Sequence, residues 1–174
     1  MKQLEKGNSL IASYQRGRNN LLSALLLSVV NIILGAVEAT FYFPFCAWLP
    51  YQFGYLGILQ LMEFDALPLV SQRLTLGYLL IAVVALVVLL LCWIFSRKHF
   101  GWLITAFVLF SLDLGVLVWS SVSFQLPELL LDIFFHIWIL VILFLGLRAG
   151  IRARKMPSHI SAEPETLGEE PKAL

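Results

Sequence analysis

Charged residues are scarce in this chain, and their scarcity limits the classes of protein to which it can belong. Of its 174 residues, 13% are charged and 60% are hydrophobic, whereas soluble domains have roughly 25% charged and 45–50% apolar residues. A chain of this length cannot bury so much apolar surface in one small core, so part of that surface must face lipid. The formal net charge is only +1, which argues against a nucleic-acid-binding surface.

Cysteines and catalytic motifs are also sparse. Cys46 and Cys92 lie in different segments and belong to no CxxC pair, so neither a metal knuckle nor a redox motif is supported. No phosphate-loop, HExxH or nucleophile-elbow motif occurs. The sequence therefore favours a protein other than an enzyme, leaves the question of enzyme activity open, and leaves any cofactor unknown.

Long hydrophobic runs are abundant. Four of them have the length of a membrane-spanning helix, roughly 17–25 residues, and they cover about residues 20–38, 74–95, 102–121 and 128–147. The last run spans only if Asp132 and His136 are tolerated inside it. We therefore expect an all-α membrane protein, a four-helix transmembrane bundle over residues 20–155. A cytoplasmic segment at 1–19 should precede it, and a Pro- and Glu-rich disordered tail at 156–174 should follow it.

The basic residues determine how many runs can span. Lys and Arg concentrate on the cytoplasmic side of membrane proteins. With four spans, both termini are cytoplasmic and every Lys and Arg except Arg73 lies on that side. A fifth span at 41–62 would move Arg97, Lys98 and the basic cluster at 148–155 to the outside. The expected location is the cell membrane, with both termini in the cytoplasm.

The uncharged aromatic segment at 41–62 connects the first two expected spans. Pro44 and Pro50 each remove a backbone donor and disfavour helix in the residue before them. We expect a broken element, re-entrant or interfacial, that serves either as a lid sealing the bundle or as a cap over a substrate cavity. The aromatic residues expected near the lipid headgroups are Tyr42, Trp48, Tyr51 and Tyr55.

Polar residues inside the spans mark the candidate site. A charged residue at the centre of a span costs roughly 2.5–3.5 kcal/mol on insertion scales, so it faces the bundle interior or water. Helical periodicity places Asn31 and Glu38 on one line of the first span, and Asp132 and His136 on one face of the fourth. Asp113 is the only charge in the third span. The candidate ligand- or proton-binding residues are Asp113, Asp132, His136, Asn31 and Glu38.

Three interpretations of these residues are open. The leading one is an outward-facing polar site that binds an ion, a proton or a small solute in a transport-associated protein, because His titrates near neutrality. The second is a structural or accessory subunit in which Asp113 pairs with His136, Asp132 orients the imidazole, and the polar groups only fix helix packing. The third is an intramembrane metalloenzyme, since imidazole and carboxylate both bind divalent metals.

The expected partners are the lipid bilayer and, as open alternatives, a membrane protein or a second copy of the chain. The basic segment LRAGIRARK at 147–155 is read first as the flank that fixes topology. It also has the composition of a site for anionic lipid headgroups.

Four stretches of the sequence carry a resemblance: RGRNNLL (16–22), ATFYFPFCAWLPYQFGYLG (39–57), LDIFFHIWIL (131–140) and LRAGIRARKMP (147–157). Together they resemble a group of small bacterial four-span membrane proteins whose function is unknown. The resemblance implies a bacterial cytoplasmic membrane. It transfers no catalytic or binding residue to this chain.

Overall fold

The computed structural model describes residues 2–62 and 68–155. Within them the chain forms five α-helices and one short 3-10 helix, and no strands. These elements are α1 (Lys2–Ala36), α2 (Trp48–Met62), α3 (Leu69–Phe95), α4 (Gly101–Ser123), the 3-10 helix η2 (Pro127–Leu129) and α5 (Leu130–Arg154). The tail expected to be disordered, 156–174, lies outside the described residues.

Four of the helices have the length and composition of membrane spans: Glu5–Ala36, Leu69–Phe95, Gly101–Ser123 and Pro127–Arg154. The shortest has 23 residues and is about 35 Å long at 1.5 Å per residue, enough for a hydrocarbon core of about 30 Å. The predicted all-α four-helix membrane bundle is therefore confirmed. Helix α1 also continues through the segment 2–19, which was expected only to be polar and cytoplasmic.

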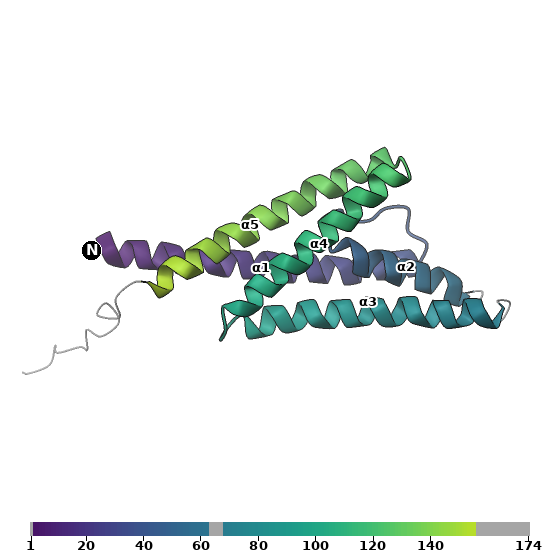
Figure 1. The fold of residues 1–174 in the computed structure, drawn as a ribbon, viewed down its shortest axis with the longest axis horizontal. Coiled ribbons are helices and arrows are strands. Elements are labelled where there is room, and N and C mark those ends of the chain that lie inside the picture. The colour runs from purple at the N-terminus through teal and green to yellow at the C-terminus, as the bar shows by residue number, and fades with distance from the viewer. Residues whose placement is uncertain (1, 63–67, 156–174) are drawn as a thin grey trace, which may run out of the picture.

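The spans alternate in direction. Helices α1 and α4 run one way and α3 and α5 run the other, so the start of α1, the α3–α4 turn and the end of α5 lie together (Figure 1). We call this the basic end, because it holds Arg97 and Lys98 in the turn and Arg152 and Arg154 in the last turn of α5. The opposite end, where α1 stops and α3 begins, is called the far end.

The segment between α1 and α2 turns back into the bundle. After α1 ends, the chain descends along it, because Phe43 bonds to the side chain of Asn31 and Ala47 bonds to that of Ser28, about one turn deeper. Helix α2 then runs outward again and ends near the start of α3 (Figure 1). Residues 37–62 thus form a hairpin packed against the bundle, and its 15-residue helix α2 is not among the four candidate spans.

Small residues let α2 fit between α1 and α3. A Cβ added at Gly54 would overlap Ile32 of α1, and one added at Gly57 would overlap Leu79 of α3. Pro50 lies in the first turn of α2, where its missing N–H has no intrahelical acceptor to lose. The predicted break lies before α2, at residues 37–47, and Pro50 is accommodated in the first turn of the short helix that follows.

Helices α1 and α5 approach closely at two facing glycines. A Cβ at Gly146 would lie 3.2 Å from the Cα of Gly17, so the two backbones are in contact. Close contact through small residues is a common means of helix association in membranes. The crossing holds α5 against α1 and positions the face that carries Asp132 and His136.

Candidate functional site

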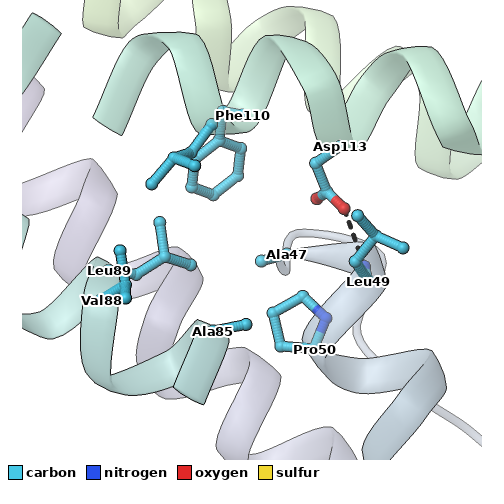
Figure 2. A pocket seen from close by; sticks show the side chains of 9 residues that line it. Ala47, Leu49, Pro50, Ala85, Val88, Leu89, Phe110 and Asp113 are labelled. Carbon is cyan, nitrogen blue, oxygen red and sulfur yellow. Dashed lines mark hydrogen bonds between the residues drawn. The ribbon is translucent and has the colours of Figure 1, made fainter. Parts of the chain in front are cut away.

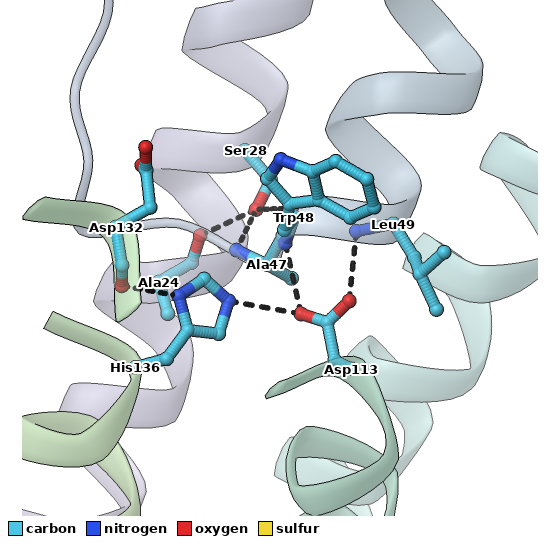
Figure 3. Close-up of polar contacts among 8 residues, drawn as sticks. All are labelled: Ala24, Ser28, Ala47, Trp48, Leu49, Asp113, Asp132 and His136. Carbon is cyan, nitrogen blue, oxygen red and sulfur yellow. Dashed lines mark hydrogen bonds and ion pairs between the residues drawn. The ribbon is translucent and has the colours of Figure 1, made fainter. Parts of the chain in front are cut away.

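Asp113 of α4 binds the start of α2 from the side (Figure 3). Asp113 is 4% exposed. Its Oδ1 accepts the N–H of Leu49 and its Oδ2 accepts the N–H of Trp48, each at 2.8 Å. The first N–H groups of a helix have no intrahelical acceptor, and the helix dipole favours an anion there. Asp113 therefore supplies to α2 the cap that α2's own sequence lacks.

His136 of α5 completes this cluster. Its Nε2 lies 3.0 Å from Oδ2 of Asp113, and its Nδ1 lies 2.8 Å from the backbone oxygen of Asp132. A carbonyl oxygen can only accept, so Nδ1 carries a proton. The contact between Nε2 and the carboxyl holds one more proton, on either side, so the His136–Asp113 pair has no net charge. The burial of both groups is thereby compensated.

The polar stripe of α1 holds the descending half of the hairpin. The amide of Asn31 donates to the oxygen of Phe43 at 2.7 Å and accepts the N–H of Phe43 at 2.8 Å. The hydroxyl of Ser28 accepts the N–H of Ala47 and donates to the oxygen of Ala24, both at 2.8 Å. Non-helical backbone inside a membrane protein needs such internal partners.

Asp132 has a different environment. It is 1% exposed; its Oδ2 accepts the hydroxyl of Tyr42 at 2.6 Å, and its Oδ1 has no hydrogen-bond partner among the described residues. Burial, and then the Asp132 carboxylate, raise the pKa of Tyr42, so this hydroxyl remains a donor. Asp132 was predicted to orient the imidazole of His136, and it does so through its backbone oxygen and not through its carboxylate.

Glu38 is not brought together with the other four candidates. Helix α1 ends before it, and Glu38 is exposed with φ 55°. The N–H groups of Glu38 and Ala39 bond back to the oxygens of Gly35 and Leu34, which is the Schellman pattern that ends helices. The predicted stripe stops at Asn31 because the helix does not continue far enough to carry Glu38.

Sequence reasoning missed the contribution of the hairpin. Tyr42 and Trp48 were expected near the headgroups; in the structure the N–H of Trp48 also bonds to Asp113, and the hydroxyl of Tyr42 donates to Asp132. A usable signal was present in the sequence. Several polar groups of the spans were expected at a similar depth, and a proline-broken segment, whose backbone needs hydrogen-bond partners, lies between two of the spans.

A small polar cavity, which we call the far pocket, lies between α1 and the hairpin at the far end. Its volume is about 150 Å³, and it is lined by Asn31, Gly35, Ala39, Thr40, Phe41, Tyr42, Tyr51 and Tyr55. Three of its tyrosines stack in a row, with ring centroids 5.8 Å apart for Tyr42 and Tyr51 and 6.0 Å apart for Tyr51 and Tyr55. Tyr42 separates this pocket from the buried carboxylate of Asp132.

A second cavity lies beside Asp113 between α2, α3 and α4 (Figure 2). It has a volume of about 190 Å³, and Asp113 is the only ionisable residue in a lining made of Ala, Leu, Val, Pro and Phe side chains. Both oxygens of Asp113 already have partners. This cavity suits apolar matter and offers little to a polar solute.

No group of three or more His, Cys, Asp and Glu side chains within residues 2–62 and 68–155 is arranged to hold a metal ion. No family model, curated protein or solved structure matches the chain. The site must therefore be interpreted from its own geometry.

Proposed function

We propose that this protein binds a small cation in the far pocket, from the side of the membrane opposite its basic end, as a transport-associated or ligand-binding membrane protein. The observation that carries the proposal is Asp132. It is a buried carboxylate with one oxygen unpartnered, and it lies directly behind a pocket-lining tyrosine. Asp113, by contrast, is compensated by His136 and by the start of α2.

The lining of the far pocket supports a cation. The faces of tyrosine rings attract cations, and three rings line this one cavity. A volume of about 150 Å³ is well below the ~300–1,000 Å³ of sites for drug-sized molecules, so the ligand must be small. Glu38, which precedes the lining residue Ala39 in the sequence and is exposed, adds a negative charge near this end of the molecule.

The distribution of charge supports an orientation for the molecule. The basic end would face the cytoplasm by the positive-inside rule, with both termini there and the far pocket open to the outside. The resemblance to small bacterial four-span proteins supports a bacterial cytoplasmic membrane.

A pair of probes of equal shape tests the proposal. We expect choline chloride to raise the unfolding temperature of the detergent-purified protein, and its uncharged isostere 3,3-dimethylbutan-1-ol to leave that temperature unchanged. Ligand at 100 times its Kd adds about 2.7 kcal/mol to stability. Equal shifts with both probes, or no shift with choline, would contradict a cation site.

Variants locate the effect. Asp132→Asn removes the carboxyl group whose Oδ1 has no partner and should abolish the choline shift, and Tyr42→Phe should weaken it. Glu128→Gln is the matched control, because Glu128 is acidic and exposed at the same end but does not line the pocket. A choline shift that Asp132→Asn leaves intact would remove Asp132 from the site.

A structural or accessory role is the second candidate. It is favoured by the complete use of Asp113, His136, Asn31 and Ser28 in holding the hairpin. Under this interpretation neither probe shifts the unfolding temperature, and crosslinking in native membranes captures a partner protein or a second copy of the chain.

A further inference from the structure

A second polar cavity lies at the basic end, far from the pocket proposed to bind a cation. It has a volume of about 260 Å³ and is formed by α1, the α3–α4 turn and α5. Arg97 and Lys98 line it from the turn, and Arg154 lines it from the end of α5. Three basic side chains from two separate parts of the chain thus converge on one cavity.

These three cations have no carboxylate partner in the described part of the chain. The one ion pair found there joins His136 to Asp113. Arg18, whose Nε donates to the hydroxyl of Ser96 at 2.8 Å, adds a further positive charge next to this cavity. Convergent like charges repel one another. A bound anion would be attracted to each of them and would offset this repulsion.

Aromatic rings hold the basic groups in place. The guanidinium of Arg154 lies 5.3 Å from the ring centroid of Phe100, and that of Arg97 lies 5.8 Å from the ring centroid of Trp93. Tyr14 stacks on Phe100, and its hydroxyl donates to the oxygen of Ser96 at 2.7 Å. Cation–π contacts of this kind limit the motion of the charged groups and leave their N–H donors available.

The cavity also depends on a glycine of α5, Gly150. A Cβ at Gly150 would overlap the ring of Phe100 and touch that of Tyr14, so only glycine lets these rings lie against α5. The N-terminus of α4, directly after Phe100, adds the positive end of a helix dipole.

The position of the cavity identifies the source of the anion. It lies at the end of the spans, where lipid headgroups are found, and it joins its basic residues to apolar ones such as Ile11, which is 52% exposed. A soluble anion would need only the charges. We propose that this cavity binds the phosphate of an anionic phospholipid in the leaflet at the basic end, with an acyl chain along the apolar wall.

Lipid binding by the full-length protein tests the proposal. Native mass spectrometry from detergent should show adducts with phosphatidylglycerol or cardiolipin in preference to phosphatidylcholine. The double variant Arg97→Gln/Arg154→Gln should lower the affinity for the anionic lipid by about tenfold or more, which is about 1.4 kcal/mol.

The matched control is Arg148→Gln/Arg152→Gln. It removes the same charge from the same end of the molecule, from residues outside the cavity. An equal loss in both double variants would show diffuse attraction to the membrane surface and overturn the site.

Two further outcomes would also overturn the proposal. One is equal binding of phosphatidylcholine. The other is stabilisation of the protein by inorganic phosphate that matches stabilisation by the lipid, which would identify a site for a soluble anion. Thermal unfolding of each variant in phosphatidylcholine nanodiscs checks that it is folded before its lipid binding is compared.

Discussion

At the scale of single residues, Asp113 shows how one buried charge can organise a fold. Its carboxylate serves three donors or potential donors: two part-buried N–H groups of α2 and the buried imidazole on α5. An unpartnered buried group costs ~1–3 kcal/mol, and more if it is charged. The residue is thus placed to hold three helices together.

We predict that Asp113→Ala lowers the free energy of unfolding by about 3–5 kcal/mol, the range seen when one partner of a buried charge pair is removed. The measurement is unfolding of the purified protein in mixed micelles. Ser111→Ala on the same helix is the control, because that hydroxyl bonds only to Phe107 within α4. A loss no greater than that of the control would show that Asp113 does not cap α2.

Asn31 allows a more local prediction. Asn31→Leu removes both hydrogen bonds to Phe43, so the descending half of the hairpin should open more often. We expect faster amide hydrogen exchange over 43–48, with exchange in the middle of α5 unchanged. Uniformly faster exchange would instead indicate loss of global stability.

At the scale of elements, α1 and α5 cross with their backbones in contact at Gly17 and Gly146. A new Cβ at either glycine would lie 3.2–3.3 Å from the Cα of the other, so one of the two backbones would have to shift by a few tenths of an ångström.

We therefore predict that Gly146→Val destabilises the bundle by about 1–3 kcal/mol or more, as overpacking does, measured by the same unfolding assay. Gly115→Val is the control, since a Cβ at Gly115 on α4 meets nothing within 4 Å. Equal effects at both positions would show that valine acts through helix propensity and not through the crossing.

The elements also show where sequence reasoning reached its limit. The four spans could be predicted because an apolar run of about 20 residues is long enough to cross the hydrocarbon core as a helix. That 41–62 would be broken followed from Pro44 and Pro50. Its path could not be predicted, because it depends on side chains of α1 and α4 that meet the hairpin backbone only in the folded molecule.

At the scale of the whole molecule, orientation is the main testable property. The far end carries Glu128 and the basic end carries Lys155, and both are exposed. The native thiols give little background, because both are fully buried, and burial raises the pKa of Cys46 to about 12.

We predict that a membrane-impermeant maleimide labels Glu128→Cys in intact cells and labels Lys155→Cys only after the cells are permeabilised. The physical reason is retention of basic flanks on the cytoplasmic side. The wild-type chain, treated in the same way, is the control. The reverse labelling pattern would invert the topology and place the far pocket in the cytoplasm.

The sequence by itself determined that this is an all-α membrane protein with four spans. The length and composition of an apolar run are local properties that do not depend on how the helices pack. It also identified Asn31, Asp113, Asp132 and His136 as buried polar groups, because charge in a span is costly wherever the helix packs.

Only the tertiary structure decided which of these groups compensate one another. Asp113 and His136 form a pair that caps α2, whereas Asp132 keeps an unpartnered oxygen behind Tyr42. Hydrogen bonds extend over only about 3 Å, so their partners depend on how α1, α4, α5 and the hairpin pack together.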